Sequence, residues 1–439
     1  MSKQLSHLTG IVTLAVFVAV CATGCRHITH EQGGTPTMPL TEDDFVSVRD
    51  GRLCLNGREY RAAGVNIPNL SQSYMGTWHH DTQIYRTTAK ARQAMIAALD
   101  DLAKHNIPFI RFFAGVGYPV DAQKLYMKDR EEFWRQMDEL FGLCRERNIR
   151  LIPSLSIFAT WAGYHGEYKN AILDPTSKTY ASTYGYVREF VTRCRDDPVV
   201  LLWELHNEIF LHADLNHTGR KPKFAALYPP GTRGHRLEPT TIEDYYTTEM
   251  LTRVCADMTR FIKSIDPNHL VTTGDAHPRD CSKSLRENWP KHVWTFDTIE
   301  EHCDSLLLQQ ARPLDVISLH VYGNFGTRYK VDNLPIVDYA RGMIRAAHAD
   351  KRPVLIGEFG QGRKRFLKDD PGAEWFLKCF DMFGAEGVSL VTLWTVHFPW
   401  QKKDFNIPDC AAHPAVFERL RRFNEDHVAP LVPSNVQGK

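Results

Sequence analysis

An apolar run that turns abruptly polar, VVLLWELHNEIF at residues 199–210, restricts the possible folds of this chain more than any other segment. The apolar residues 199–203 follow Asp197-Pro198, which is typical of a strand buried on both faces of a parallel sheet. The polar residues that come directly after it are Glu204, His206, Asn207 and Glu208. In α/β barrels, the residues that carry the chemistry lie just past the C-terminal ends of such strands.

A second segment, RPVLIGEFG at residues 352–360, repeats this arrangement. Its apolar residues 354–356 predict another buried strand, and Glu358 follows at the C-terminal end. Two carboxylates on strands far apart in sequence can meet over the mouth of a barrel, and paired carboxylates are suited to cleaving a glycosidic bond. Glu208 and Glu358 are therefore the predicted catalytic residues.

Apolar runs and amphipathic segments alternate along the rest of the chain. The predicted strands are 62–66, 108–113, 149–155, 199–203, 270–274, 316–320, 354–358 and 388–394. The predicted helices are 89–104, 130–147, 180–195, 242–265, 337–349, 373–383 and 415–426. This alternation predicts an α/β fold of the (β/α)8 TIM-barrel type. Turn signals at Asp50-Gly51 and Asn56-Gly57 predict a short N-terminal β-hairpin cap, and residues 211–240 and 279–313 predict long loop insertions.

Length and charge favour one large enzyme-sized domain over residues 45–430. The chain has 439 residues, and single α/β barrels run from roughly 200 to more than 400 residues when they carry insertions. The formal net charge is +1, which gives no electrostatic field for nucleic acid or for an anionic membrane surface. We therefore expect no nucleic-acid partner, and we expect a monomer.

The first 25 residues have the features of an export signal. Lys3 precedes the apolar segment Ile11–Val20, which is too short to span a membrane, and small residues then lead to Cys25. This ending resembles the lipobox of bacterial lipoproteins, in which Cys25 would carry the lipid. The prediction is an exported protein, lipid-anchored to a bacterial membrane, with residues 26–44 as a flexible tether. The alternative is an ordinary cleaved signal peptide with a chance cysteine.

Eight further cysteines show no C-x-x-C motif and no metal-binding spacing, and neither do His206, His212 and His217. We therefore expect no metal site and no cofactor. Cys281 with Cys303 is the only candidate disulfide pair that the sequence suggests.

Together, these signals resemble the family 5 glycoside hydrolases, the cellulase and β-mannanase group of clan A. In that clan the acid/base Glu follows an Asn at the end of strand four, and the nucleophile Glu ends strand seven. Asn207-Glu208 and Glu358 match these places, and Trp203-Glu204-Leu205 resembles the mannanase version. The resemblance implies substrate-binding roles for Arg111, Asn207, His320, Tyr322 and Trp394.

The sequence departs from the family pattern around this site. Ile209 takes the place of the Pro that usually follows the acid/base Glu, and His206 takes that of an Ala in typical mannanases. Ser154 and Ser156 lie where the family commonly has a His on strand three. These departures leave the carboxylate pair intact and bear on the identity of the substrate.

The resemblance implies a retaining β-glycoside hydrolase that acts on a β-linked poly- or oligosaccharide of mannan or glucan type. Glu358 would attack the anomeric carbon, and Glu208 would first donate a proton and then act as a base. Arg111 and Tyr322 would keep Glu358 ionised. Two alternatives stay open: a lipid-anchored, non-catalytic carbohydrate-binding barrel, and a transglycosylase that uses the same covalent intermediate.

Overall fold

The computed structural model describes residues 41, 44–78, 80–116, 120–158, 161–216, 218, 241–322, 328–361, 371–401 and 405–425. The predicted signal segment 1–25, with Cys25, lies outside these residues, as does most of the predicted tether 26–44. Among the helices that are described, none is both long and apolar enough to cross a bilayer.

The described chain begins with a small antiparallel sheet of β1 (Ser47–Arg49), β2 (Arg52–Leu55) and β3 (Arg58–Glu59). Both turns use two successive residues with positive φ, Asp50-Gly51 and Asn56-Gly57, as two-residue hairpins require. The apolar side chains of β2 pack with barrel residues such as Phe109 and Leu355, which lie at or near the start of their strands. The predicted hairpin cap is therefore present, and it closes the N-terminal end of the barrel.

Eight parallel strands form the central sheet in the order β8-β7-β6-β5-β4-β11-β10-β9. Their bounds are β4 (Ala62–Asn66), β5 (Phe109–Phe113), β6 (Arg150–Ser154), β7 (Trp203–Glu204), β8 (Val271–Thr272), β9 (Ile317–Tyr322), β10 (Val354–Gly360) and β11 (Leu390–Leu393). A parallel bridge between Thr272 and Val316 joins the two edges. The predicted (β/α)8 barrel is thus confirmed.

Strands β7 and β8 are shorter than the sequence predicts, with two residues each. The apolar run before β7 is nevertheless paired on both sides. Leu201 N donates to Leu151 O at 2.7 Å, and Trp203 N donates to Leu270 O at 2.8 Å. The run is buried as expected, although its ladder is less regular than that of its neighbours.

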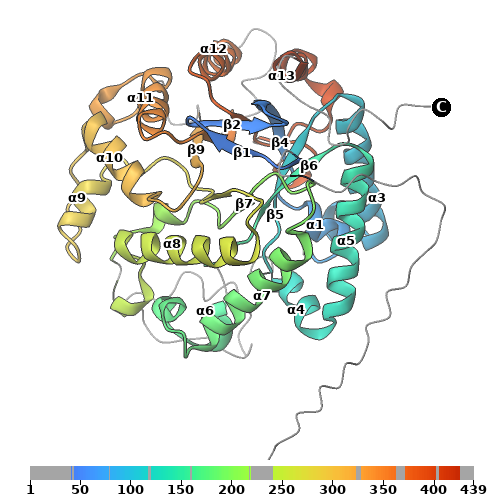
Figure 1. Cartoon of the computed structure of the whole chain (residues 1–439), viewed down its shortest axis with the longest axis horizontal. Coiled ribbons are helices and arrows are strands. Elements are labelled where there is room, and N and C mark those ends of the chain that lie inside the picture. The colour runs from blue at the N-terminus through green and yellow to red at the C-terminus, as the bar shows by residue number, and fades with distance from the viewer. Residues whose placement is uncertain are drawn as a thin grey trace, which may run out of the picture. The chain divides into compact units, whose positions relative to one another are not determined.

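Helices surround the sheet (Figure 1). The long ones are α3 (Thr88–Lys104), α5 (Arg130–Glu146), α7 (Lys178–Cys194), α8 (Thr248–Ile265), α10 (Ile299–Gln309), α11 (Ile336–Ala349), α12 (Pro371–Ala385) and α13 (Pro414–Glu425). The shorter ones are α1 (Leu70–Met75), α2 (Asp81–Ile84), α4 (Val120–Lys128), α6 (Trp161–His165) and α9 (Ser282–Glu287). Helix α8 begins six residues later than predicted, because Thr247 caps it and Ile242–Asp244 forms a separate 3₁₀ turn.

The segment 279–313, predicted as an irregular insertion, contains α9 and α10. The prediction was wrong because the buried face of α10 is largely polar, so the apolar periodicity of a helix is missing. Its buried residues are His302, Ser305, Leu306 and Gln309. The capping box of Thr298 and Glu301 was the local signal for this helix.

Cys281 and Cys303 are free thiols, so the candidate disulfide pair is wrong. Burial raises the pKa of Cys281 to about 12 and that of Cys303 to about 11. Both thiols are therefore protonated at neutral pH, which suppresses the thiolate chemistry that disulfide formation needs.

Candidate active site

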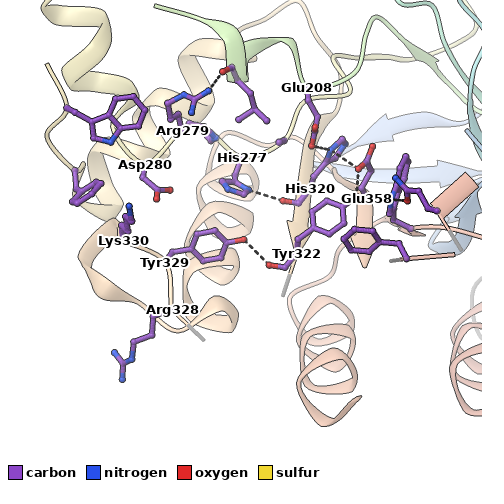
Figure 2. A pocket seen from close by; sticks show the side chains of 18 residues that line it. Glu208, His277, Arg279, Asp280, His320, Tyr322, Arg328, Tyr329, Lys330 and Glu358 are labelled. Atoms are coloured by element: carbon purple, nitrogen blue, oxygen red, sulfur yellow. Dashed lines mark hydrogen bonds and ion pairs between the residues drawn. The ribbon is translucent and has the colours of Figure 1, made fainter. Parts of the chain in front are cut away.

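The predicted site residues converge at the C-terminal end of the barrel. Glu208 follows β7, His320 and Tyr322 lie in β9, Glu358 lies in β10, and Trp394 follows β11. All five line one cleft of about 620 Å³ (Figure 2). The buried strand ends thus bring together residues that are up to 186 positions apart in sequence (394 minus 208).

Arg111 lies beside Glu358, as expected of a cation that keeps this carboxylate ionised, but its side chain is fully buried, so the substrate-binding role that the resemblance implies does not extend to direct contact with a sugar. Its Nε and Nη2 atoms donate to the two oxygens of Glu204 at 2.6 and 2.8 Å. Nη1 donates to Glu358 Oε1 at 2.9 Å and to Asn66 Oδ1 at 3.0 Å. The guanidinium therefore positions the carboxylates rather than a sugar.

One further hydrogen bond from Arg111 orients the side chain of Asn207. Arg111 Nη2 donates to Asn207 Oδ1 at 2.6 Å. Because the carbonyl end of the amide faces the guanidinium, its NH₂ end points elsewhere and remains a donor for a hydroxyl. This orientation agrees with the predicted role of Asn207 toward substrate.

Glu358 is 4% exposed and has a polar partner at each carboxylate oxygen. Arg111 donates to Oε1, and the Tyr322 hydroxyl donates to Oε2. Burial raises the pKa of Glu358 above its usual range, and the neighbouring Glu208 adds to the rise. His320, Arg111 and Tyr322 act in the opposite direction and favour the ionised carboxylate.

Glu208 has a different environment, with 30% of its side chain exposed to the cleft. His320 Nδ1 lies 2.8 Å from Glu208 Oε1. Burial raises the pKa of Glu208, and only the charges of Arg111 and His277 oppose this rise. Glu358 is thus better stabilised as an anion and Glu208 is better suited to hold a proton, which is the division that an acid and a nucleophile require.

His320 lies between the two carboxylates. Its Nδ1 atom is also 3.5 Å from Glu358 Oε2. Burial lowers the pKa of His320 to about 4, so the imidazole is neutral at neutral pH. A carboxylate oxygen of Glu208 and one of Glu358 lie within 4.8 Å of each other. This separation fits the short spacing of the carboxyl groups in retaining glycosidases.

Three residues of the site were not assigned a role from the sequence: Glu204, Asn66 and His277. Glu204 and Asn66 bind Arg111, and only the three-dimensional structure shows that partnership. His277 follows β8, lines the cleft and bonds through Nδ1 to the carbonyl oxygen of His320 at 2.9 Å. Its place after a predicted strand end was the only available signal.

Two groups of described residues bring suitable metal-binding atoms within 4.8 Å of one another: Glu208, His320 and Glu358, and Asp101, His105 and Cys410. In the first group, the Arg111 guanidinium already forms an ion pair with Glu358, and its positive charge opposes the binding of a metal cation there. In the second, Asp101 Oδ2 already accepts bonds from His397 Nε2 and from Cys410 N, both at 2.9 Å.

Hydrogen bonds to residues just after β8 hold the loop that carries Glu208. Glu208 N donates to Gly274 O at 3.1 Å, and Phe210 N donates to Asp275 Oδ1 at 3.1 Å. Glu208 itself has φ 53°, in the left-handed region. Gly274 has φ 82°, and a Cβ there would overlap the carbonyl oxygen of His206 and the side chain of Glu204.

We expect Gly274→Ala to lower the free energy of unfolding by roughly 2–5 kcal/mol, because left-handed strain and overlap add together. Gly57→Ala is the matched control, since Gly57 has φ 72° but no atom within 4 Å of a new Cβ. It should cost only the strain, about 1–2 kcal/mol. Urea unfolding of both variants measures the difference, and equal losses would contradict the close packing at Gly274.

Comparison with known proteins gives a coherent result. The family model described as Cellulase (glycosyl hydrolase family 5) matches residues 61–398. Mannan endo-1,4-beta-mannosidase 7 of rice is 28% identical over 258 residues, which are 52% of this chain and 58% of the rice protein. The chain thus spans less than three fifths of the length of this curated relative.

Solved structures share the fold. The endo-1,4-beta-mannanase from Rhizomucor miehei superposes with a TM-score of 0.57 at 16% identity, covering 87% of this chain and 99% of that one. An exo-beta-1,4-mannosidase from Opitutaceae bacterium strain TAV5 gives a TM-score of 0.54 at 15% identity, covering 89% and 62%. At such low identity these likenesses establish the barrel alone.

Proposed function

Since the chain belongs to glycosyl hydrolase family 5, whose model matches residues 61–398, we propose that it is a retaining β-glycoside hydrolase acting on a β-mannan type of polysaccharide. The observation that carries this proposal is the pair of carboxylates, Glu208 and Glu358, within 4.8 Å of each other in one cleft. The mannan preference is supported by the names of the relatives, several of which are mannan endo-1,4-beta-mannosidases.

In the first step, Glu358 attacks the anomeric carbon while Glu208 protonates the leaving oxygen. Arg111 and Tyr322 hold the nucleophile through hydrogen bonds to its two oxygens. The hydrogen bond from Tyr322 changes when the carboxylate becomes an ester. The loss of that negative charge then lowers the proton affinity of Glu208, which removes a proton from the attacking water. The neutral His320 stays beside Glu208 and can accept or donate at Nδ1 in both steps.

An intact carboxylate pair argues against the non-catalytic barrel. The orientation of Asn207 adds a donor for a sugar hydroxyl. Trp394 adds an apolar wall to the cleft, and its Nε1 donates to Gln401 Oε1 at 3.0 Å, which fixes the ring. A hydrogen-bond donor beside an apolar wall suits a bound sugar whose glycosidic bond lies over the two carboxylates.

Hydrolysis of soluble β-mannan, followed by proton NMR, tests the proposal. We expect the first-formed reducing ends to be β-anomers, because two displacements at the anomeric carbon restore its configuration. A β-glucan of matched chain length is the control for sugar identity. First-formed α-anomers would contradict the retaining mechanism, and cleavage of the glucan alone would contradict the mannan preference.

We also propose that the protein is exported and anchored by a lipid on Cys25, on the basis of the segment Ile11–Val20 and the small residues before the cysteine. Expression of the full chain in a bacterium should place it in the membrane fraction, and Cys25→Ser should move it to the soluble fraction. Cys303→Ser is the control, because it replaces a cysteine within the barrel domain. Unchanged membrane fractionation of Cys25→Ser would contradict the anchor.

A further inference from the structure

Beside the catalytic carboxylates the cleft continues into a region that we call the basic arm, formed by Arg279, Asp280, Trp294, Phe296 and Lys330. The first two residues lie between β8 and α9, the aromatic pair lies between α9 and α10, and Lys330 follows β9. In Figure 2 the side chains of Arg279, Asp280 and Lys330 gather on the side of the cleft away from Glu358.

The two aromatic rings of the basic arm are unusually exposed. Trp294 is 49% exposed and Phe296 is 46% exposed, whereas Trp203 and Phe359 in the core are fully buried. Exposed apolar rings on the wall of a cleft offer flat surfaces on which the C–H face of a sugar can stack. A chain that occupies the catalytic pair can therefore extend over this arm.

A cation lies over each ring. Arg279 Cζ is 5.6 Å from the centroid of Trp294, and Lys330 Nζ is 5.0 Å from that of Phe296. Arg279 donates through Nη2 to the carbonyl oxygen of Leu211, and its buried Nε atom has no hydrogen-bond partner among the residues that the structure describes. Burial lowers the pKa of Arg279 because it desolvates the guanidinium, and the nearby Cys281 and Asp280 oppose this shift without cancelling it.

The environment of Arg279 differs from that of Arg111. Arg111 is deeper in the same end of the barrel and forms ion pairs with both Glu204 and Glu358. Asp280 is the one carboxylate of the basic arm, and it faces two cations. Arg328, the third cation at this wall, donates through Nη1 to the carbonyl oxygen of Asn333 at 2.8 Å, and in Figure 2 its side chain extends away from Glu358 and from the other two cations. A neutral mannan would leave the excess positive charge of the basic arm without a partner.

We propose that the basic arm binds a sugar unit that bears a carboxylate, so that the substrate of this enzyme is an acidic β-glycan. This proposal rests on the proposed function and specifies its substrate class. The sugar ring stacks on Trp294 or Phe296, and its carboxylate accepts from the Arg279 guanidinium and pairs with Lys330. A planar guanidinium suits a planar carboxylate, which makes Arg279 the residue that sets the specificity.

The test compares two polymers that differ in charge and not in bulk: carboxymethyl β-mannan and hydroxyethyl β-mannan of matched substitution. We expect the full chain to show kcat/KM roughly 10-fold higher for the carboxymethyl polymer at low salt, with the preference shrinking as salt is added. In Arg279→Gln/Lys330→Gln the ratio should fall to within about twofold of one. Arg328→Gln is the matched control and should keep the preference.

Binding to the Glu358→Ala variant, measured by calorimetry with the same two polymers, separates this proposal from the proposed function. A carboxymethyl preference in this binding, together with no hydrolysis of either polymer by the unsubstituted chain, would overturn the function and leave the basic arm supported. Equal affinities, or a preference that survives the double substitution, would overturn the basic arm. A β-linked oligosaccharide with a uronic acid unit in the chain, compared with one carrying a pendant pyruvate ketal, then identifies which source of carboxylate binds more tightly.

Discussion

Glu358→Ala is expected to reduce kcat by on the order of 10⁴- to 10⁶-fold, the loss seen when a nucleophile is removed from a covalent mechanism. The residue would form the covalent bond to the sugar, and a second nucleophile is absent from the described wall of the cleft, where the other carboxylates are Glu208 and Asp280. Steady-state hydrolysis of an aryl β-mannoside with a good leaving group measures the loss.

Sodium azide should restore part of this activity. Removing the side chain leaves a space that a small anion can fill, beside the positive charge of Arg111 and the Tyr322 hydroxyl that previously bound Glu358. A single displacement by azide inverts the anomeric carbon, so the product should be the α-glycosyl azide. Rescue also shows that the variant is folded. Residual activity within about tenfold of the wild type would assign the nucleophile elsewhere.

The strand ends were predictable from the sequence, whereas the connections between side chains were not. Continuous apolar runs mark strands that are buried on both faces, and the polar residues that follow each run lie at or near the mouth of the barrel. Glu208 and Glu358 could be located in this way because each follows such a run. The boundaries of β7 and β8 were less certain, since their ladders are short.

Two features could not be predicted from the sequence, each for a physical reason. Helix α10 buries His302, Ser305 and Gln309, so its inward face lacks the apolar period on which helix prediction depends. Arg111 was placed on the correct strand, but a sequence cannot show whether a charged residue faces substrate or closes an ion pair inside the barrel. Its four partners come from β4, β7 and its loop, and β10, and only folding brings them together.

Glu208→Ala should give a loss that depends on the leaving group. Activity on mannotetraose should fall by roughly 10²- to 10⁴-fold, which is the usual contribution of a general acid. Formation of the glycosyl-enzyme from a dinitrophenyl β-mannoside should be nearly unaffected, because dinitrophenolate leaves without a proton. Pre-steady-state release of dinitrophenol should then show a burst, since removal of the base slows the second step. Azide should speed that step and yield the β-glycosyl azide.

The pH profile of activity distinguishes a proton-donating role of Glu208 from a merely structural one. In the wild type, activity on mannotetraose should fall at low pH as Glu358 gains a proton, and at high pH as Glu208 loses its own. Burial raises the pKa of Glu208, so its proton persists to higher pH than that of an exposed carboxyl, and the basic limb moves upward with it. In Glu208→Ala the basic limb should disappear from the residual activity on mannotetraose, whose leaving group needs a proton, while the acidic limb remains. A basic limb that persists in this variant would mean that another group donates the proton, and His277, which lines the same cleft and lies near Glu208, would be the next residue to substitute.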